Sequence, residues 1–140
     1  MKLPHTITVF NRINGSGKTR FSPTVIKGCL NRIVYATPKS VTGEENGNGT
    51  KLYIPLTADT SGKRYISPEK YKRLTEDDRN GFYTFSPDND FYTVGAFDTE
   101  NTNEIDTATI KGLSTVYKIT AAELLDFGDS SLQHWEVQGR

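Results

Sequence analysis

The chain is short of cysteine and histidine, and it has no acidic residue among its first 43 positions. With Cys29 alone, one copy forms no internal disulfide and no zinc site built on several cysteines. No apolar run approaches the roughly 18–20 residues that a membrane-spanning helix needs. The opening, MKLPHTITVF, lacks the apolar stretch of a secretory signal. These absences predict a chain made and kept in a reducing compartment.

The amounts of apolar and charged residues predict one small domain. Hydrophobic residues make up 34% of the 140 positions, which suits a single domain over residues 1–140 with a modest core and long polar loops. Residues 1–43 hold seven Lys and Arg and no acid, which leaves ten basic and 17 acidic residues in the remainder. Either the first strands pair with later acidic strands, or a basic face and an acidic face pack head to tail between copies.

Short runs rich in β-branched and aromatic residues predict a mainly β fold. Strands are expected at 5–13, 20–36, 51–56, 82–86, 91–97, from 115 onward, and at 132–137. Gly28 in the second run predicts a bulge or a close approach. Ser67 and Pro68 are typical of a helix start, so a short helix is expected at 67–81, with one helical turn at 107–113. The pattern favours a small β-barrel or sandwich of about six short strands, one or two short helices and long loops.

The stretch NGSGKT, residues 14–19, matches the end of a phosphate-binding loop, yet it predicts a hairpin tip. The full motif requires a glycine where this chain has Arg12, and a helix must follow it. Here RFSPTV follows, which contains Pro23 and strand-forming residues. The Asn14-Gly15 pair between two β-rich runs favours a tight turn. Nucleotide binding is therefore not expected.

The remaining reactive groups favour structural roles. His5 and His134 lie at opposite ends of the chain, and one metal site would need both of them together with carboxylates. Cys29 lies in a β-rich run and is expected to be buried. The segment SPDND, 86–90, lacks the glycine and distal glutamate of a calcium loop, so a turn capped by Asx side chains is expected. We therefore expect no enzyme activity, metal or cofactor.

Aromatic residues are expected mainly in the core, with base stacking by strand aromatics as the alternative. Trp135, in the last strand, is predicted to pack inward with Val137 on the same face. The alternative for Trp135 is a contact with another subunit, where tryptophan is enriched. Residues 37–50 form a loop that is unusually long for a compact domain, and such loops are commonly functional or disordered.

Several segments, taken in order, carry a family likeness. They are HTITVFNRI, TVIKGC, LYIPL, YISPEKYKRL, FYTFSPDNDFYTVGAF, YKIT and LQHWEV. Together they resemble the head–tail connector proteins of long-tailed phages that infect Gram-positive bacteria, in particular head-completion or stopper proteins. The likeness covers nearly the whole chain, and TENTNEIDTAT is the stretch that departs from it.

The resemblance implies a non-enzymatic virion protein at the head–tail interface, made in the host cytoplasm. Such a protein forms a homo-oligomeric ring between portal or adaptor proteins and tail terminator or tail tube proteins, where it retains packaged DNA and docks the tail. The long loop would then reach the channel, with Lys39, Val41, Gly43, Glu44, Glu45, Asn46, Gly47, Asn48 and Gly49 as candidate residues. The candidate interface residues are Arg12, Lys18, Arg20, Lys27 and Trp135.

Three other functions remain open from the sequence. They are a different tail-completion or minor tail protein, a nucleic-acid-binding β-barrel, and a hydrolase whose site carries no recognisable motif.

Overall fold

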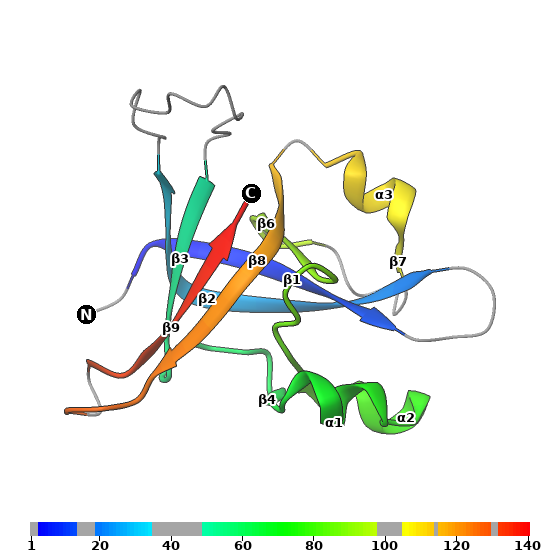
Figure 1. Cartoon of the computed structure of the whole chain (residues 1–140), viewed down its shortest axis with the longest axis horizontal. Helices are drawn as coiled ribbons and strands as arrows, with labels where there is room; N and C mark the ends of the chain where they lie inside the picture. The colour runs from blue at the N-terminus through cyan, green and yellow to red at the C-terminus, as the bar shows by residue number, and fades with distance from the viewer. Residues whose placement is uncertain (1–2, 14–18, 35–48, 98–104, 114, 130–131) are drawn as a thin grey trace, which may run out of the picture.

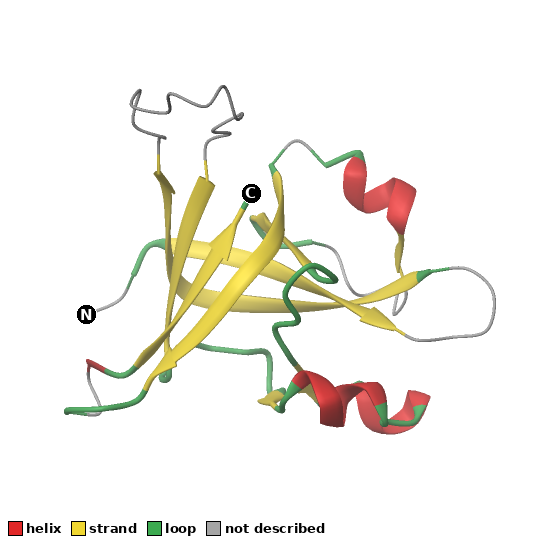
Figure 2. Ribbon diagram, viewed as in Figure 1, coloured by secondary structure: helices red, strands yellow, loops and turns green. Residues whose placement is uncertain are grey.

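The structure is a computed structural model that describes residues 3–13, 19–34, 49–97, 105–113, 115–129 and 132–140. Six strands form its frame: β1 (His5–Ile13), β2 (Arg20–Val34), β3 (Gly49–Pro55), β6 (Phe91–Val94), β8 (Val116–Leu125) and β9 (His134–Gly139). The smaller elements are β4 (Arg64–Tyr65), β5 (Phe82–Tyr83), β7 (Ile105–Asp106), α1 (Pro68–Lys72), α2 (Glu76–Arg79) and α3 (Thr107–Lys111). The fold is mainly β, as the sequence predicts (Figure 2).

The strands form two crossing layers of antiparallel pairs. The pairings run in a circuit, β1–β6–β8–β9–β3–β2, and return to β1. Two long strands belong to both layers, because β2 pairs first with β1 and then with β3, while β8 pairs first with β6 and then with β9. Figure 1 shows β1 and the first half of β2 running across the view, with β3, β8 and β9 steeply inclined to them. The result is a sandwich-like β domain.

A bulge at Gly28 lies where β2 passes from one layer to the other. Lys27 and Cys29 face the consecutive residues Thr6 and His5, so Gly28 is the extra residue. Its φ of +89° lies in the left-handed region, which glycine adopts without strain. The bend that a bulge produces lets β2 continue from β1 to β3, and the sequence-based prediction is confirmed.

The main core lies between the two layers. Its fully buried members include Ile7, Val9, Leu52 and Val137, and Cys29 lies among them. Phe10 points to the opposite face of β1 and packs with Phe21, Ile105 and Ile110 beneath β7 and α3. Because both faces of β1 are covered, the strand is buried from Ile7 to Asn11.

The predicted helix at 67–81 is two helices. Ser67 caps α1 and Pro68 opens it, as expected, but the first helix ends with Arg73 as its C-cap. The Thr75 side chain then accepts from the Asp78 N–H and starts α2. Thr75 is a favourable N-cap residue, so a second helix begins after it within the range that was predicted as one helix.

Several strand ends differ from the predicted ones. The last strand begins at His134 and the third at Gly49, while β2 ends at Val34. Pairing of Ile13 with Arg20 makes residues 14–19 the connection of a hairpin, whose tip at 14–18 lies outside the described residues. Gly49 and Thr50 belong to β3, so the loop predicted at 37–50 ends two residues earlier than expected. Its remaining residues up to Asn48 also lie outside the described part.

Candidate docking surface

The hairpin of β8 and β9 forms an arm that is anchored at its base. Trp135 is 8% exposed and packs against the Tyr65 and Phe85 rings, with centroids 4.4 and 5.2 Å away. Val137 is fully buried on the same face of β9, which confirms the predicted orientation of both side chains. In Figure 1 the two strands run past the body of the domain to the lower left. The core therefore holds the arm in a fixed direction.

The end of this arm exposes large apolar side chains among acidic ones. Phe127 is 75% exposed, Leu132 is 68% exposed and Leu124 is 39% exposed. The exposed carboxylates Glu123 and Asp126 lie beside them, and residues 119–139 contain no Lys or Arg. We call Glu123, Leu124, Asp126, Phe127 and Leu132 the hairpin tip. It combines apolar area with negative charge.

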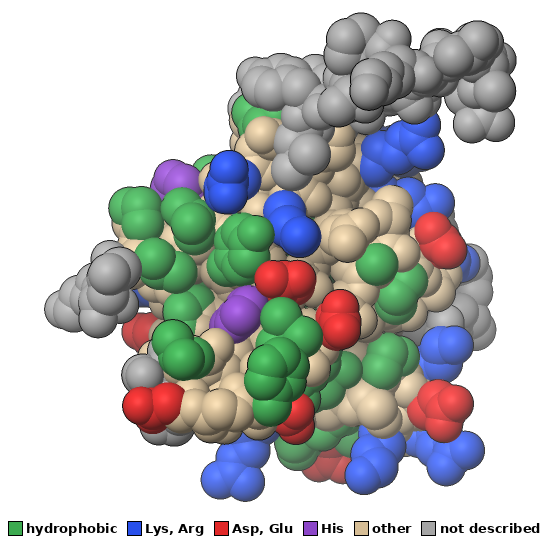
Figure 3. All heavy atoms as spheres, turned by 60° about the vertical axis from the view of Figure 1, so that its left-hand side comes forward, with side chains coloured by type: hydrophobic (Ala, Val, Ile, Leu, Met, Phe, Trp, Pro, Cys, Tyr) green, Lys and Arg blue, Asp and Glu red, His purple; other side chains and the backbone are tan. Residues whose placement is uncertain are grey.

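A shallow groove of about 440 Å³ continues from the hairpin tip over the outer face of β2, β3 and β9. Leu30, Tyr53, Pro55, Leu132 and His134 are among the side chains that line it. The Tyr53 and His134 rings lie 5.8 Å apart, and the Leu132 carbonyl lies 2.8 Å from His134 Nδ1. Figure 3 shows this side of the molecule, where hydrophobic clusters adjoin one another with acidic side chains between them. Tip and groove form one continuous surface.

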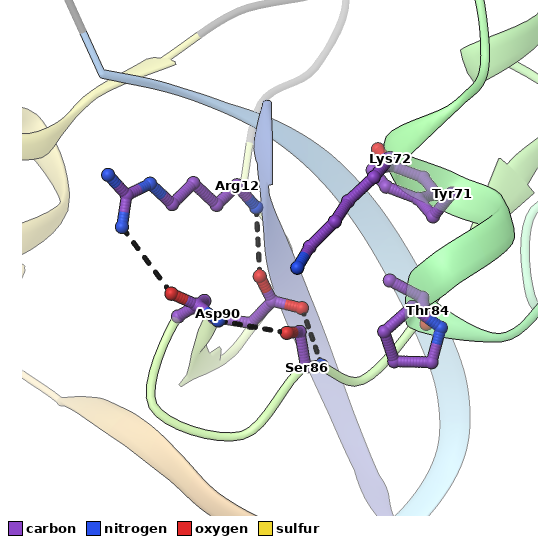
Figure 4. Close-up of a pocket in the computed structure, with 8 residues that line it drawn as sticks. Arg12, Tyr71, Lys72, Thr84, Ser86 and Asp90 are labelled. Carbon is purple, nitrogen blue, oxygen red and sulfur yellow. Dashed lines mark hydrogen bonds between the residues drawn. The ribbon is translucent and has the colours of Figure 1, made fainter. Parts of the chain in front are cut away.

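A smaller pocket of about 90 Å³ lies between β1, α1 and the turn before β6 (Figure 4). Asp90 lies at its floor and accepts hydrogen bonds from Asn11 Nδ2 at 2.9 Å, and from the Arg12 and Ser86 N–H groups at 2.8 Å each. Burial raises the pKa of Asp90 to about 6, and these donors oppose the rise. Both carboxylate oxygens are engaged, so Asp90 ties β1 to the turn at 86–90, where its side chain caps the Ser86 N–H as SPDND predicts.

Other polar groups of this pocket have no partner. The Tyr71 hydroxyl and Thr84 Oγ1 are buried without a hydrogen bond in the part of the chain that the structure describes. Burial raises the pKa of Tyr71 to about 12, and the nearby Ser22 side chain and the Arg79 charge oppose the rise. Lys72 extends from α1 toward the Asp90 carboxylate in Figure 4. Both hydroxyl oxygens have almost no exposed area, so a ligand from outside could not reach them without a rearrangement.

The structure disperses the predicted interface residues. Arg12 and Arg20 lie at the same end of the β1–β2 pair, whereas Lys27 lies toward the other end, opposite Thr6. Lys27 and Arg12 are exposed, and the Arg12 guanidinium donates to Asn89 Oδ1 at 3.4 Å. Trp135 is buried between the layers. Lys18 and, apart from Gly49, the candidate channel-loop residues lie outside the described residues.

A group of basic side chains that the sequence analysis did not single out lies on β4, on α1 and at the C-cap of α1. Arg64, Lys70, Lys72 and Arg73 are all exposed, and we call them the basic surface. The neighbouring Lys63 is turned inward, where its ammonium donates to the Pro23 carbonyl and to Thr24 Oγ1, and burial lowers its pKa. The stretch KRYISPEKYKR was the available signal, since it holds one acid among five basic residues.

The chemically reactive groups among the described residues lie in surroundings that do not suit catalysis or metal binding. Cys29 is fully buried and burial raises its pKa to about 12, so its thiol has neither the exposure nor the ionisation of a nucleophile. Within the described ranges, no three His, Cys, Asp or Glu side chains gather as metal ligands would. No helix among them has the length and apolar character to cross a bilayer.

Comparison with known proteins gives a family but no activity. The family that matches is described as "Family of unknown function (DUF6751)", and the match runs over residues 3–140. No curated protein and no solved structure matches the chain.

Proposed function

The chain belongs to this family of unknown function, and we propose that it is a structural head–tail connector of a long-tailed phage. In this role it is a head-completion or stopper protein whose copies form a ring between the portal or adaptor proteins and the tail. The phage assignment is supported by the sequence resemblance, and the role in assembly is supported by the exposed hairpin tip.

The exposed hairpin tip is the observation that carries the proposal. Soluble monomers rarely leave neighbouring large apolar side chains in water, and such patches commonly mark contacts with other proteins. Phe127 and Leu132 stand at the end of an arm that Trp135 fixes to the core. A fixed arm loses little conformational freedom on binding, which favours its use as a contact between subunits.

The position of the arm also suits a ring with a central channel. β3 begins at Gly49, which pairs with Val34, and its other end, Pro55, pairs with His134 beside the tip. The connection between β2 and β3 therefore leaves the layer at the end away from the hairpin tip. Subunits that contact their neighbours through the hairpin tip would leave the end of the layer at Val34 and Gly49 uncovered, where the channel would lie.

A mixing experiment tests the proposed function. Sedimentation of the purified chain, alone and with portal assemblies encoded in the same genome, would report whether the chain joins them as a multimer. The double variant Phe127→Ser/Leu132→Ser should no longer join them, while keeping the thermal unfolding midpoint of the parent. Ile33→Ser is the matched control, because Ile33 is 52% exposed but lies at the far end of the layer. A parent chain that stays monomeric in both settings would refute the proposal.

Two other functions are compatible with parts of this geometry. A tail-completion or minor tail protein would use the same hairpin tip, and the chain would then bind isolated tail tubes instead of portal assemblies. The basic surface favours a nucleic-acid-binding domain, in which case retention on heparin would fall when Lys70 and Arg73 are replaced. The mixing experiment and a heparin column together separate these from the connector.

A further inference from the structure

We propose that the hairpin tip of one copy docks on the basic surface of the next copy. This inference rests on the proposed ring and names the contact that closes it. The acidic side chains of the tip would face Arg64, Lys70, Lys72 and Arg73, and its apolar side chains would cover the neighbouring part of α1.

Charge complementarity is the first argument for this pairing. Glu123 and Asp126 are exposed on the hairpin tip, in a stretch without any Lys or Arg. The basic surface presents four exposed cations, and its four side chains form no ion pair with any carboxylate whose side chain the structure describes. Opposite potentials of this kind steer encounter and fix the register of an interface.

The placement of the two surfaces is the second argument. Figure 1 shows the tip of the β8–β9 hairpin at the lower left, while α1 lies along the lower edge to the right of centre, so the two surfaces are separate patches. A contact between two different patches is heterologous, so each copy offers one patch to each neighbour. Such contacts close into a ring when the rotation between copies allows it.

The pocket beside α1 is the third argument, because the basic surface reaches it through one of its cations. Lys72 belongs to the basic surface and also lines this pocket. Its volume of about 90 Å³ exceeds the roughly 10–15 Å³ that one water needs by the same measure. A carboxylate of the neighbouring tip, such as that of Asp126, would accept a hydrogen bond from the Lys72 ammonium at this pocket. The Asp90 carboxylate repels it less than a free acid would, since its oxygens face N–H donors.

Nearby acids limit where the tip can land. Glu69 lies within α1, and Asp78 is exposed on the following helix. Both would repel Glu123 and Asp126, so the tip is expected beside Lys70 and Arg73, which lie three residues apart on one side of the helix, with Lys72 turned toward the pocket. The same acids make the contact directional, because the tip binds only where cations outnumber carboxylates.

A charge-swap experiment tests the contact. The first variant, Glu123→Lys/Asp126→Lys, makes the tip basic, and the second, Lys70→Glu/Arg73→Glu, makes the receiving surface acidic. All four positions are exposed, so both variants should unfold at the temperature of the parent. Each variant alone should self-associate at least about tenfold more weakly than the parent, because like charges then face each other across the contact. An equimolar mixture should regain assembly, since each tip then meets a surface of opposite sign.

The outcomes separate the contact from the proposed function. If the parent assembles and both single-surface variants assemble equally well, this contact is wrong while the connector role stands. If the parent does not assemble even with portal assemblies, the proposed function fails and the contact with it. If Lys70→Glu/Arg73→Glu abolishes DNA binding and leaves assembly intact, the basic surface serves nucleic acid and the contact is refuted. Carboxyl–amine cross-linking of the parent should join Asp126 to Lys70 or Lys72 between chains.

Discussion

Replacing Trp135 by Ala tests the claim that the arm is anchored in the core. Trp135 is 8% exposed and contacts Tyr65 and Phe85 at ring distances of 4.4 and 5.2 Å. Removing a large buried aromatic costs about 3–5 kcal/mol of unfolding free energy, of which each lost aromatic pair accounts for about 0.5–1.5 kcal/mol. Domains of this size are stable by about 5–15 kcal/mol, so the loss is a large share of the total.

Urea unfolding followed by far-UV circular dichroism is the suitable assay, because the substitution removes the only tryptophan. Trp135→Phe should lose less stability, since one ring still packs against Tyr65. Phe127→Ala is the surface control, and its free energy of unfolding should differ from that of the parent by no more than about 0.5 kcal/mol. A Trp135→Ala variant that unfolds at the urea concentration of the parent would show that the arm is not held by this side chain.

Three further predictions concern other parts of the chain. The raised pKa of Asp90 means that the folded chain holds this proton more tightly than the unfolded chain does. The stabilisation from protonated Asp90 is therefore complete below pH 3.8, and the free energy of unfolding falls by about 3 kcal/mol as the pH rises to about 6. Subtracting the profile of Asp90→Asn isolates this trend, and a difference that is flat or rises with pH contradicts it. Lys18→Ala should leave stability and assembly unchanged, and saturable ATP binding that this change abolishes would restore the nucleotide hypothesis. Deletion of 43–49 should leave the fold intact but produce particles that lose DNA, so infectious particles with full-length DNA would exclude a channel plug.

The parts of the fold that follow local rules could be predicted from the sequence. Ile7 and Val9 are two residues apart in HTITVFNRI, so the two-residue period of a strand places them on one face, and both are core residues. A glycine inside a β-rich run indicated the bulge at Gly28, and the two-residue period placed Trp135 and Val137 on one face. In each case the signal lies within a few neighbouring residues.

The features that depend on tertiary contacts could not be predicted from the sequence. The segment TAAELLDF contains good helix formers, yet pairing with β9 keeps it extended as far as Leu125. The turn around Asp90 was expected, but its burial depends on Asn11 and Arg12 from a strand far away in sequence. The basic surface is visible as a cluster of Lys and Arg in residues 63–73. The net charge of the chain after residue 43 hides this cluster, because that part holds 17 acidic and ten basic residues.

The central claim is that copies of this chain form a ring between the phage head and tail, and electron cryomicroscopy of the intact neck tests it most directly. The account predicts a ring of copies between portal and tail, with each hairpin tip seated against α1 of the adjacent copy. The account would be contradicted if the density of the neck held no copy of this fold, whether the particle contained the protein elsewhere or lacked it.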